Sequence, residues 1–85
     1  MELVWLEKSW EEYCIWQTQD KKIVKRINAI IKDILRSPYE GIAKPEPLKF
    51  SLSGYWSRRI DDVNRIVYGV KGERIIIVSC KGHYD

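Results

Sequence analysis

The chain has 85 residues, of which 45% are hydrophobic, and a formal net charge of +3. A chain this short buries only about 60% of the surface that its unfolded form exposes, so we expect residues 1–85 to form one domain with a small core. Its two cysteines lie far apart and its single histidine leaves too few ligands for zinc, so we expect no disulfide, metal or other cofactor. No apolar run approaches the roughly 20 residues that span a membrane, and the N-terminal stretch is acidic, so we expect a cytoplasmic protein.

The N-terminal half predicts one strand followed by two helices. Residues 2–6 form a short apolar run that is long enough for a strand. Ser9 and Glu12 have the S-x-x-E spacing of a capping box, which predicts a helix from Ser9 to about Thr18. Asp20 is then well placed to cap a second helix through its carboxylate.

This second helix has the clearest pattern in the chain. Seven apolar residues fall on one stripe at helical spacing: Ile23, Val24, Ile27, Ile30, Ile31, Ile34 and Leu35. We expect the stripe to pack on a sheet and the helix to end at Ser37-Pro38, because proline disfavours the helical conformation of the residue before it.

The C-terminal half predicts a loop and three strands. Residues 38–47 contain three prolines and a glycine, so we expect a stiff functional loop without regular structure. Residues 55–60, 65–70 and 74–79 are rich in β-branched and aromatic residues and should form a meander. The order of elements predicts an α+β domain, in which the two helices cover one face of a mainly antiparallel four-stranded sheet.

The positive charge is concentrated in this C-terminal half. Residues 1–43 hold seven Lys/Arg and seven Asp/Glu, whereas residues 44–85 hold eight and five. Such an excess fits a surface that faces nucleic acid, but many soluble domains carry a similar excess on an ordinary solvated surface. Charge alone favours the ordinary surface.

Two residues suggest acid-base chemistry on RNA. Cleavage by the RNA's own 2′-hydroxyl needs a base for that hydroxyl, an acid for the departing 5′-oxygen, and cations for the phosphorane. Glu46 lies between two prolines and two lysines in residues 44–49, and His83 is the one side chain that exchanges protons readily near neutrality. Each taken alone is more often an ordinary surface residue.

Three arginines flank the polar turn at residues 61–64 and could supply the cations. Strand alternation sends Arg58 and Arg59 to opposite faces of the sheet, so only one of them shares the face of Arg65. The choice depends on the hairpin register, which the sequence leaves open. Salt bridges to the two aspartates of the turn are the alternative role for these arginines.

The remaining cations and aromatic residues have less specific roles. Lys49 and Lys81 lie near strand ends, and each is expected to contact a phosphate or to be a solvated surface charge. Tyr84 could stack on a base or cover the sheet edge, and Trp56 could lie in the core or form a stacking surface. The other tryptophans are expected to lie in the core or to pack between helix and sheet: Trp5, Trp10 and Trp16.

With these motifs assembled, the chain resembles the YoeB toxins of the RelE superfamily, which belong to bacterial type II toxin-antitoxin systems. The resemblance covers essentially the whole length and is carried by Trp10, Trp16-Gln17, KPEPLK at 44–49, LSGYWSRRI at 52–60, RIVY at 65–68 and CKGHY at 80–84. It implies a RelE-like fold and a ribosome-dependent endoribonuclease that cuts messenger RNA in the ribosomal A site without a metal. It also implies a cognate antitoxin similar to YefM, the ribosome as partner, and a toxin that typically dimerises.

The resemblance also implies roles for individual residues. The residue matching Glu46 serves as general base, that matching His83 as general acid, and that matching Arg65 stabilises the transition state. Further positions support the phosphate and the base: Lys49, Arg59 and Tyr84. The chain departs from the family by adding Asp85, whose carboxylate we expect to favour the charged form of His83.

Two other functions fit the same fold. A non-catalytic toxin would block DNA gyrase, as ParE toxins do, or a ribosomal subunit. A plain RNA-binding module would use the basic meander. Neither function needs a carboxylate, an arginine and a histidine together, so the His83→Gln change separates both from catalysis.

Overall fold

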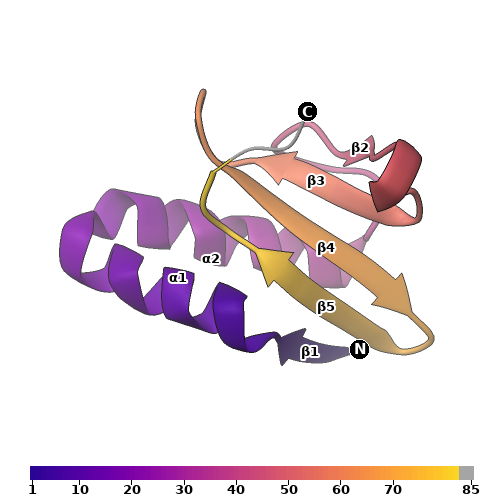
Figure 1. The fold of residues 1–85 in the computed structure, drawn as a ribbon, viewed down its shortest axis with the longest axis horizontal. Helices are drawn as coiled ribbons and strands as arrows, with labels where there is room; N and C mark the ends of the chain where they lie inside the picture. Colours follow the sequence, from indigo (N-terminus) through magenta and orange to yellow (C-terminus); the bar gives the residue numbers. More distant parts are fainter. Residues whose placement is uncertain (83–85) are drawn as a thin grey trace.

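The computed structural model describes residues 1–82 and consists of two helices packed on one face of a five-stranded sheet (Figure 1). In chain order the elements are β1 (Glu2–Trp5), α1 (Glu7–Gln19), α2 (Lys21–Arg36), β2 (Glu46–Pro47), the 3-10 turn η1 (Phe50–Leu52), β3 (Tyr55–Arg59), β4 (Arg65–Lys71) and β5 (Arg74–Ser79). The predicted α+β class and the order of its long elements are confirmed. Within the described part, no helix is long and apolar enough to cross a membrane.

The sheet has the strand order β1-β5-β4-β3-β2 and one parallel pair, β1 with β5. The prediction of four strands is wrong, because two residues of the loop at 38–47 form the edge strand β2. Glu46 pairs with Ser57 and Pro47 with Trp56, in antiparallel orientation. Proline is tolerated there because an edge strand needs no backbone donor on its outer side.

The start of α1 differs from the prediction. The helix begins at Glu7 rather than Ser9. The Ser9 hydroxyl has one hydrogen to donate, and the carbonyls of Ile77 (2.6 Å) and Leu6 (2.9 Å) both lie within its reach. The Glu12 carboxylate accepts from the backbone N–H of Cys80 at 2.8 Å. The predicted capping box is therefore wrong: Ser9 and Glu12 attach α1 to β5 and the residues that follow it.

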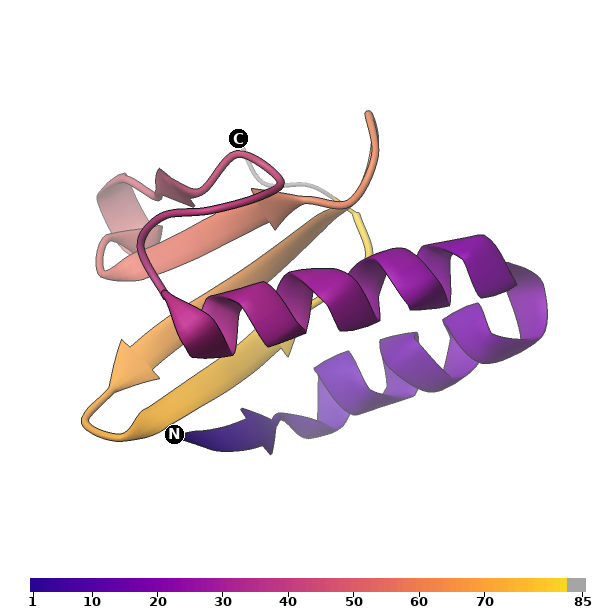
Figure 2. The ribbon, with the colours of Figure 1, turned by 180° about the vertical axis from the view of Figure 1, so that it is seen from behind.

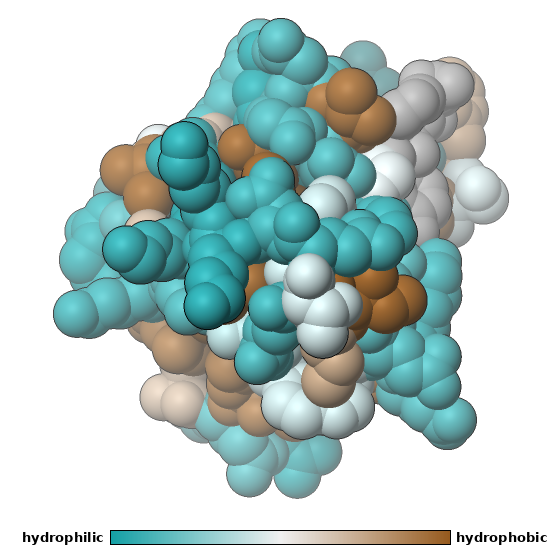
Figure 3. All heavy atoms as spheres, turned by 90° about the vertical axis from the view of Figure 1, so that its left-hand side faces the viewer, coloured by the Kyte–Doolittle hydropathy of each residue, from teal (hydrophilic) through white to brown (hydrophobic). Residues whose placement is uncertain are grey.

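The predicted stripe of α2 is confirmed. Asp20 caps the helix by accepting hydrogen bonds from the backbone N–H groups of Lys22 and Ile23. The stripe packs against residues of the sheet, and the view from behind shows α2 lying across the sheet (Figure 2). Its centre is fully buried, at Ile27, Ile30 and Ile34. Seen from the end where α1 joins α2, the surface is mainly hydrophilic and its hydrophobic patches are small (Figure 3).

The tryptophans divide between core and surface. The buried Trp16 donates its indole N–H to the carbonyl of Cys80 at 2.9 Å. Trp5 and Trp56 are half-buried against the core, and Trp56 also contacts the ring of Tyr39. Trp10 is 49% exposed and lies outside the core, but its ring lies against that of Trp5 on β1, which agrees with the expected packing between helix and sheet.

Arg58 is completely buried between the sheet and the segment that follows α2. Its guanidinium donates to Oδ2 of Asp33 at 2.7 Å and to the hydroxyl of Tyr68 at 3.1 Å. It also donates to three backbone carbonyls, those of Ser37, Glu40 and Ile42. A buried charge is tolerated when its hydrogen bonds are satisfied, and here they hold the segment at 37–42 against β3.

Asp33 should make the stability of the domain sensitive to acid. The Arg58 guanidinium, with help from the Ile42 backbone N–H and Arg36, lowers the pKa of Asp33 from 3.8 to about 2. A carboxyl whose pKa is lowered by folding stabilises fully above its unfolded pKa, and that contribution is lost as the pH falls from about 4 to 2. We expect the unfolding temperature to drop in this window.

The acid sensitivity is measured by thermal unfolding, followed by circular dichroism, from pH 5 to pH 2. Asp33→Asn should lower the unfolding temperature at pH 5 and flatten its dependence between pH 4 and pH 2. Asp62→Asn, at an exposed position of the 61–64 turn, is the matched control and should leave the slope intact. An equally steep slope in Asp33→Asn would contradict the assignment.

Candidate active site

The open face of the sheet, away from the helices, brings together side chains from three strands. Glu46 pairs with Ser57, and Arg59 pairs with Arg65. Residues paired across antiparallel strands share a face, and so do residues two apart on one strand. The register therefore puts Glu46, Ser57, Arg59 and Arg65 on one face, whereas Arg58 points toward the helices.

Three of these side chains, those of Glu46, Ser57 and Arg65, line a small polar hollow. It has a volume of about 160 Å³ and is lined by Glu46, Leu48, Ser57 and Arg65. The Glu46 side chain is 58% exposed, and its carboxylate lies 4.0 Å from Nζ of Lys44. A carboxylate and a guanidinium thus face one space that is open to a ligand.

The turn between β3 and β4 fixes Arg65. Nη1 of Arg65 donates to the carbonyls of Asp61 (2.6 Å) and Asn64 (3.1 Å). Among residues 1–82 its side chain makes hydrogen bonds through Nη1 alone, and no bond of Nε or Nη2 is found within this range. Within the same range no ion pair joins an arginine to the aspartates of this turn, so that alternative is wrong for Arg58, Arg59 and Arg65.

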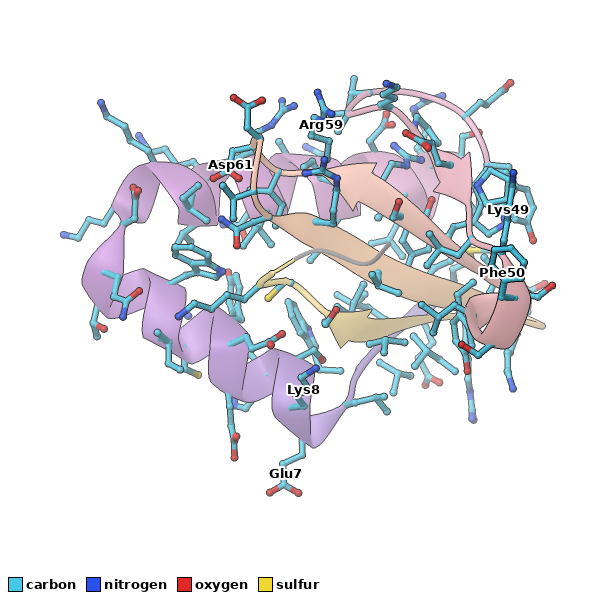
Figure 4. All side chains as sticks on the ribbon, turned by 45° about the horizontal axis from the view of Figure 1, so that its top comes forward. Glu7, Lys8, Lys49, Phe50, Arg59 and Asp61 are labelled. Atoms are coloured by element: carbon cyan, nitrogen blue, oxygen red, sulfur yellow. The ribbon has the colours of Figure 1, made fainter. Side chains whose placement is uncertain are left out.

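Asp61 gives the turn its shape. Its Oδ1 accepts from the backbone N–H groups of Val63 (2.8 Å) and Asn64 (2.6 Å). Burial alone would raise the pKa of Asp61, but these hydrogen bonds outweigh burial and lower it. The charged Asp61 carboxylate thereby stabilises the turn whose carbonyls bind Arg65. Asp61 and Arg59 both lie at this end of the sheet (Figure 4).

The segment after β5 returns to the same turn. The backbone N–H of Gly82 donates to Oδ1 of Asn64 at 2.8 Å, and the Arg65 N–H donates to the Gly82 carbonyl at 2.8 Å. The three residues after Gly82, to which the sequence analysis assigns roles, lie outside the described residues: His83, Tyr84 and Asp85. Gly82, the residue that precedes His83 in the chain, is therefore held beside Arg65 at the start of β4.

The backbone that leads into Glu46 has an unusual conformation. Ala43 and Lys44 have φ angles of 63° and 56°, in the left-handed region that costs a residue with a side chain roughly 1–2 kcal/mol. The N–H of Arg59 donates to the Ala43 carbonyl at 2.6 Å, just after the segment that Arg58 holds. Hydrogen bonds thus fix the approach to Glu46, and strain of this kind is found most often at functional sites.

The other predicted residues lie around this site or away from it. Lys49 is exposed and lies two residues after the end of β2. Nζ of Lys81 lies 5.4 Å from the centre of the Trp16 ring, so this lysine is engaged with α1. Sequence reasoning missed Ser57, which strand alternation would have placed opposite Glu46 once β2 was recognised. Among residues 1–82, no cluster of three or more His, Cys, Asp or Glu could hold a metal ion.

Comparison with known proteins gives one consistent match. The family described as YoeB-like toxin of bacterial type II toxin-antitoxin system matches residues 5–84. A toxin YoeB of Escherichia coli O6:H1 is 55% identical over 84 residues, which cover 99% of this chain and all of the relative. A YoeB/ParE toxin from Agrobacterium tumefaciens superposes with a TM-score of 0.96 at 45% identity and covers 99% of this chain and all of its own.

A third relative has been solved in two assemblies. The YoeB of Staphylococcus aureus is known as a dimer, which superposes with a TM-score of 0.91 at 46% identity. It is also known as a heterotetrameric YoeB-YefM toxin-antitoxin complex, with a TM-score of 0.90 at 46% identity. Both superpositions cover 99% of this chain and 98% of the relative.

Proposed function

Because the chain belongs to the YoeB-like toxin family of bacterial type II toxin-antitoxin systems, we propose that it is a ribosome-dependent endoribonuclease acting on messenger RNA. One observation carries the proposal: Glu46 and Arg65 line the same polar hollow, and Gly82, the neighbour of His83, is hydrogen-bonded to the backbone of Arg65. Glu46 and Arg65 would supply a base and a cation on the open face, and the proposal takes His83, the residue after Gly82, as the acid. A toxin that only blocks its target would need no such combination.

The proposed reaction breaks the RNA chain without a metal. Glu46 takes the proton of the 2′-hydroxyl, whose oxygen attacks the adjacent phosphorus atom. Arg65 stabilises the negative charge on the phosphorane through the N–H groups of its guanidinium. His83 gives a proton to the departing 5′-oxygen, so the products are a 2′,3′-cyclic phosphate and a 5′-hydroxyl. Lys49, Arg59 and Tyr84 support the phosphate and the base.

The ribosome is proposed as the partner that completes the site. The hollow is small and the Glu46 carboxylate is mostly exposed, so among residues 1–82 little would hold a 2′-hydroxyl in line for attack. Positioning of reactants contributes a large share of most enzymatic rates. Messenger RNA bound in the ribosomal A site would arrive already positioned, in the cytoplasm, where translation takes place.

We further propose two protein partners. The Staphylococcus aureus relative was solved with YefM, so a YefM-like antitoxin is the expected inhibitor of this chain. The same relative was solved as a dimer, so a second copy of the chain is the expected partner in its absence.

The proposal is tested by mapping 5′ ends of messenger RNA in a purified translation system. We expect the wild type to cut within the A site and Arg65→Gln to cut roughly 10²- to 10³-fold more slowly, the usual cost of one donor to a developing charge. Arg74→Gln, which removes an exposed arginine at the far end of β4 and β5, is the matched control and should cut normally.

Two outcomes would contradict the proposal. Arg65→Gln cutting at the wild-type rate would remove Arg65 from the chemistry. A wild-type protein that stops translation, or inhibits gyrase, without producing new 5′ ends would favour a non-catalytic toxin. In a parallel reaction, free RNA of the same sequence should be cut far more slowly than RNA on ribosomes, and equal rates would exclude ribosomal positioning.

A further inference from the structure

Phe50 combines two unfavourable features in one residue. Its side chain is 90% exposed, the highest value among the exposed large hydrophobic residues that the structure describes. Its φ angle is 58°, in the left-handed region where a bulky side chain is a clear outlier. A single exposed hydrophobic residue needs no explanation, but exposure together with backbone strain does.

The backbone around Phe50 is held in a defined shape. The N–H of Leu52 donates to the Lys49 carbonyl at 3.1 Å, and that of Ser53 to the Phe50 carbonyl at 3.0 Å. Just before the turn, the Leu48 N–H donates to the Tyr55 carbonyl at 2.9 Å and continues the pairing of β2 with β3. The ring of Phe50 is therefore presented to solvent by a structured turn.

Phe50 also differs from the other exposed aromatic residues. Trp10 lies against the rings of Trp5 and Tyr13, and Tyr39 lies 5.1 Å from the ring of Trp56. No ring pair among residues 1–82 includes Phe50, so within this range neither face of its ring is covered by another aromatic residue. Its sequence neighbour is the exposed Lys49, and both project from the same end of the molecule, away from Arg59 (Figure 4).

The position of Phe50 relates it to the candidate active site. It follows Glu46 by four residues, so the two backbone positions lie at most roughly 14 Å apart. Stacked nucleotides advance by about 3.4 Å along one strand. A ring at this distance would meet a base within a few nucleotides of the phosphate that faces Glu46 and Arg65.

We infer that Phe50 is a stacking platform for an unpaired RNA base next to the cleaved bond, with Lys49 contacting the phosphate of that nucleotide. The inference rests on the proposed function and adds to it a residue that binds but does not react. An exposed aromatic ring beside a cation is the combination that single-stranded nucleic acids bind, because every base offers a π-face and every nucleotide a charge. A base in a duplex has both faces covered, so the expected ligand is unpaired RNA.

Cleavage kinetics on ribosomes test the inference. We expect Phe50→Ala to raise KM for messenger-loaded ribosomes and lower kcat/KM by about 5- to 150-fold, the range for loss of one aromatic-base stack. kcat at saturating ribosomes should stay near the wild-type value, because Phe50 touches no reacting atom. Phe50→Trp should retain activity, and the matched control Ile15→Ala, at an exposed site on α1 behind the sheet, should change neither constant.

The design separates this inference from the proposed function. If the wild type fails to cut messenger RNA, the proposed function fails. If the wild type cuts and Phe50→Ala has the same KM and kcat, only the stacking role is overturned. Thermal unfolding of each variant is measured alongside, and Phe50→Ala should melt at or above the wild-type temperature because the ring is not buried.

Photo-crosslinking identifies the ligand. With p-benzoylphenylalanine in place of Phe50, irradiation of toxin bound to messenger-loaded ribosomes should link it to an RNA base. A link to messenger RNA and a link to ribosomal RNA both support stacking and distinguish the two sources of the base. Links to ribosomal proteins alone, or loss of antitoxin binding in Phe50→Ala with unchanged cleavage, would assign the ring to a protein partner and overturn the inference.

Discussion

His83→Gln should lower the rate of messenger cleavage by roughly 10²- to 10⁴-fold, the usual contribution of one acid-base group. Glutamine keeps a polar side chain of similar length but cannot donate a proton to the departing 5′-oxygen near neutral pH. The backbone bonds from Gly82 to Asn64 and Arg65 do not involve the imidazole, so the anchored segment should be unchanged in the variant. The loss should therefore lie in the chemical step.

Single-turnover cleavage at saturating ribosomes measures this step directly. A substrate with sulfur in place of the bridging 5′-oxygen has a leaving group that needs no protonation, so it should restore most of the rate of His83→Gln. The same substrate should not rescue Glu46→Gln, which lacks the base. Unchanged cleavage by His83→Gln, or the absence of rescue by sulfur, would remove His83 from the role of general acid.

Arg58→Met should lower the free energy of unfolding by about 3–5 kcal/mol, the usual cost of breaking a buried ion pair by removing one partner. Methionine fills part of the space, but it leaves three carbonyls without the Arg58 donor and takes the buried guanidinium from the Asp33 carboxylate, which keeps only Arg36 and the Ile42 N–H. In a domain of this size 1 kcal/mol corresponds to roughly 4–8 °C, so the unfolding temperature should fall by at least about 12 °C.

Chemical denaturation measures the effect, with Arg74→Met as matched control. Arg74 pairs with Glu2 at 2.8 Å on the surface, and exposed ion pairs contribute about 0–1 kcal/mol. The double change Arg58→Met with Asp33→Leu should recover part of the loss, because removing both partners leaves no buried charge unpaired. A loss in Arg58→Met as small as that in the control would show that the buried network contributes little.

The regular elements were predictable because their signals are local. The stripe of α2 and its Asp20 cap are set by residues three or four positions apart, and both were found. The strands β3, β4 and β5 agree with prediction to within about one residue, since β-branched and aromatic runs between polar turns indicate strands on their own.

The errors share one cause, which is a partner distant in sequence. Glu46 and Pro47 form a strand only because β3 lies beside them, and nothing in two residues signals that pairing. Ser9 and Glu12 match a capping box, but the carbonyl of Ile77 and the N–H of Cys80 compete successfully for them. The burial of Arg58 likewise depends on Asp33, which precedes it by 25 residues.

The candidate site was predictable in part. Glu46 and Arg65 were chosen as residue types suited to RNA cleavage and by family resemblance, and the register brings both to one hollow. The register also decides between Arg58 and Arg59, which residue identity could not do. Phe50 gave no signal, because neither its exposure nor its positive φ can be read from its neighbours.

The parallel pairing of β1 with β5 has a consequence for the timing of folding during synthesis. Residues 2–5 leave the ribosome early, but their partners at 74–77 are made only near the end of the domain. Until then β1 has no neighbour, and α1 lacks its bonds to Ile77 and Cys80. A nascent chain therefore has neither a closed sheet nor the contact of Gly82 with Arg65. If the proposed function is right, the nascent toxin cannot cut the messenger RNA of the ribosome that makes it until synthesis of the domain is complete.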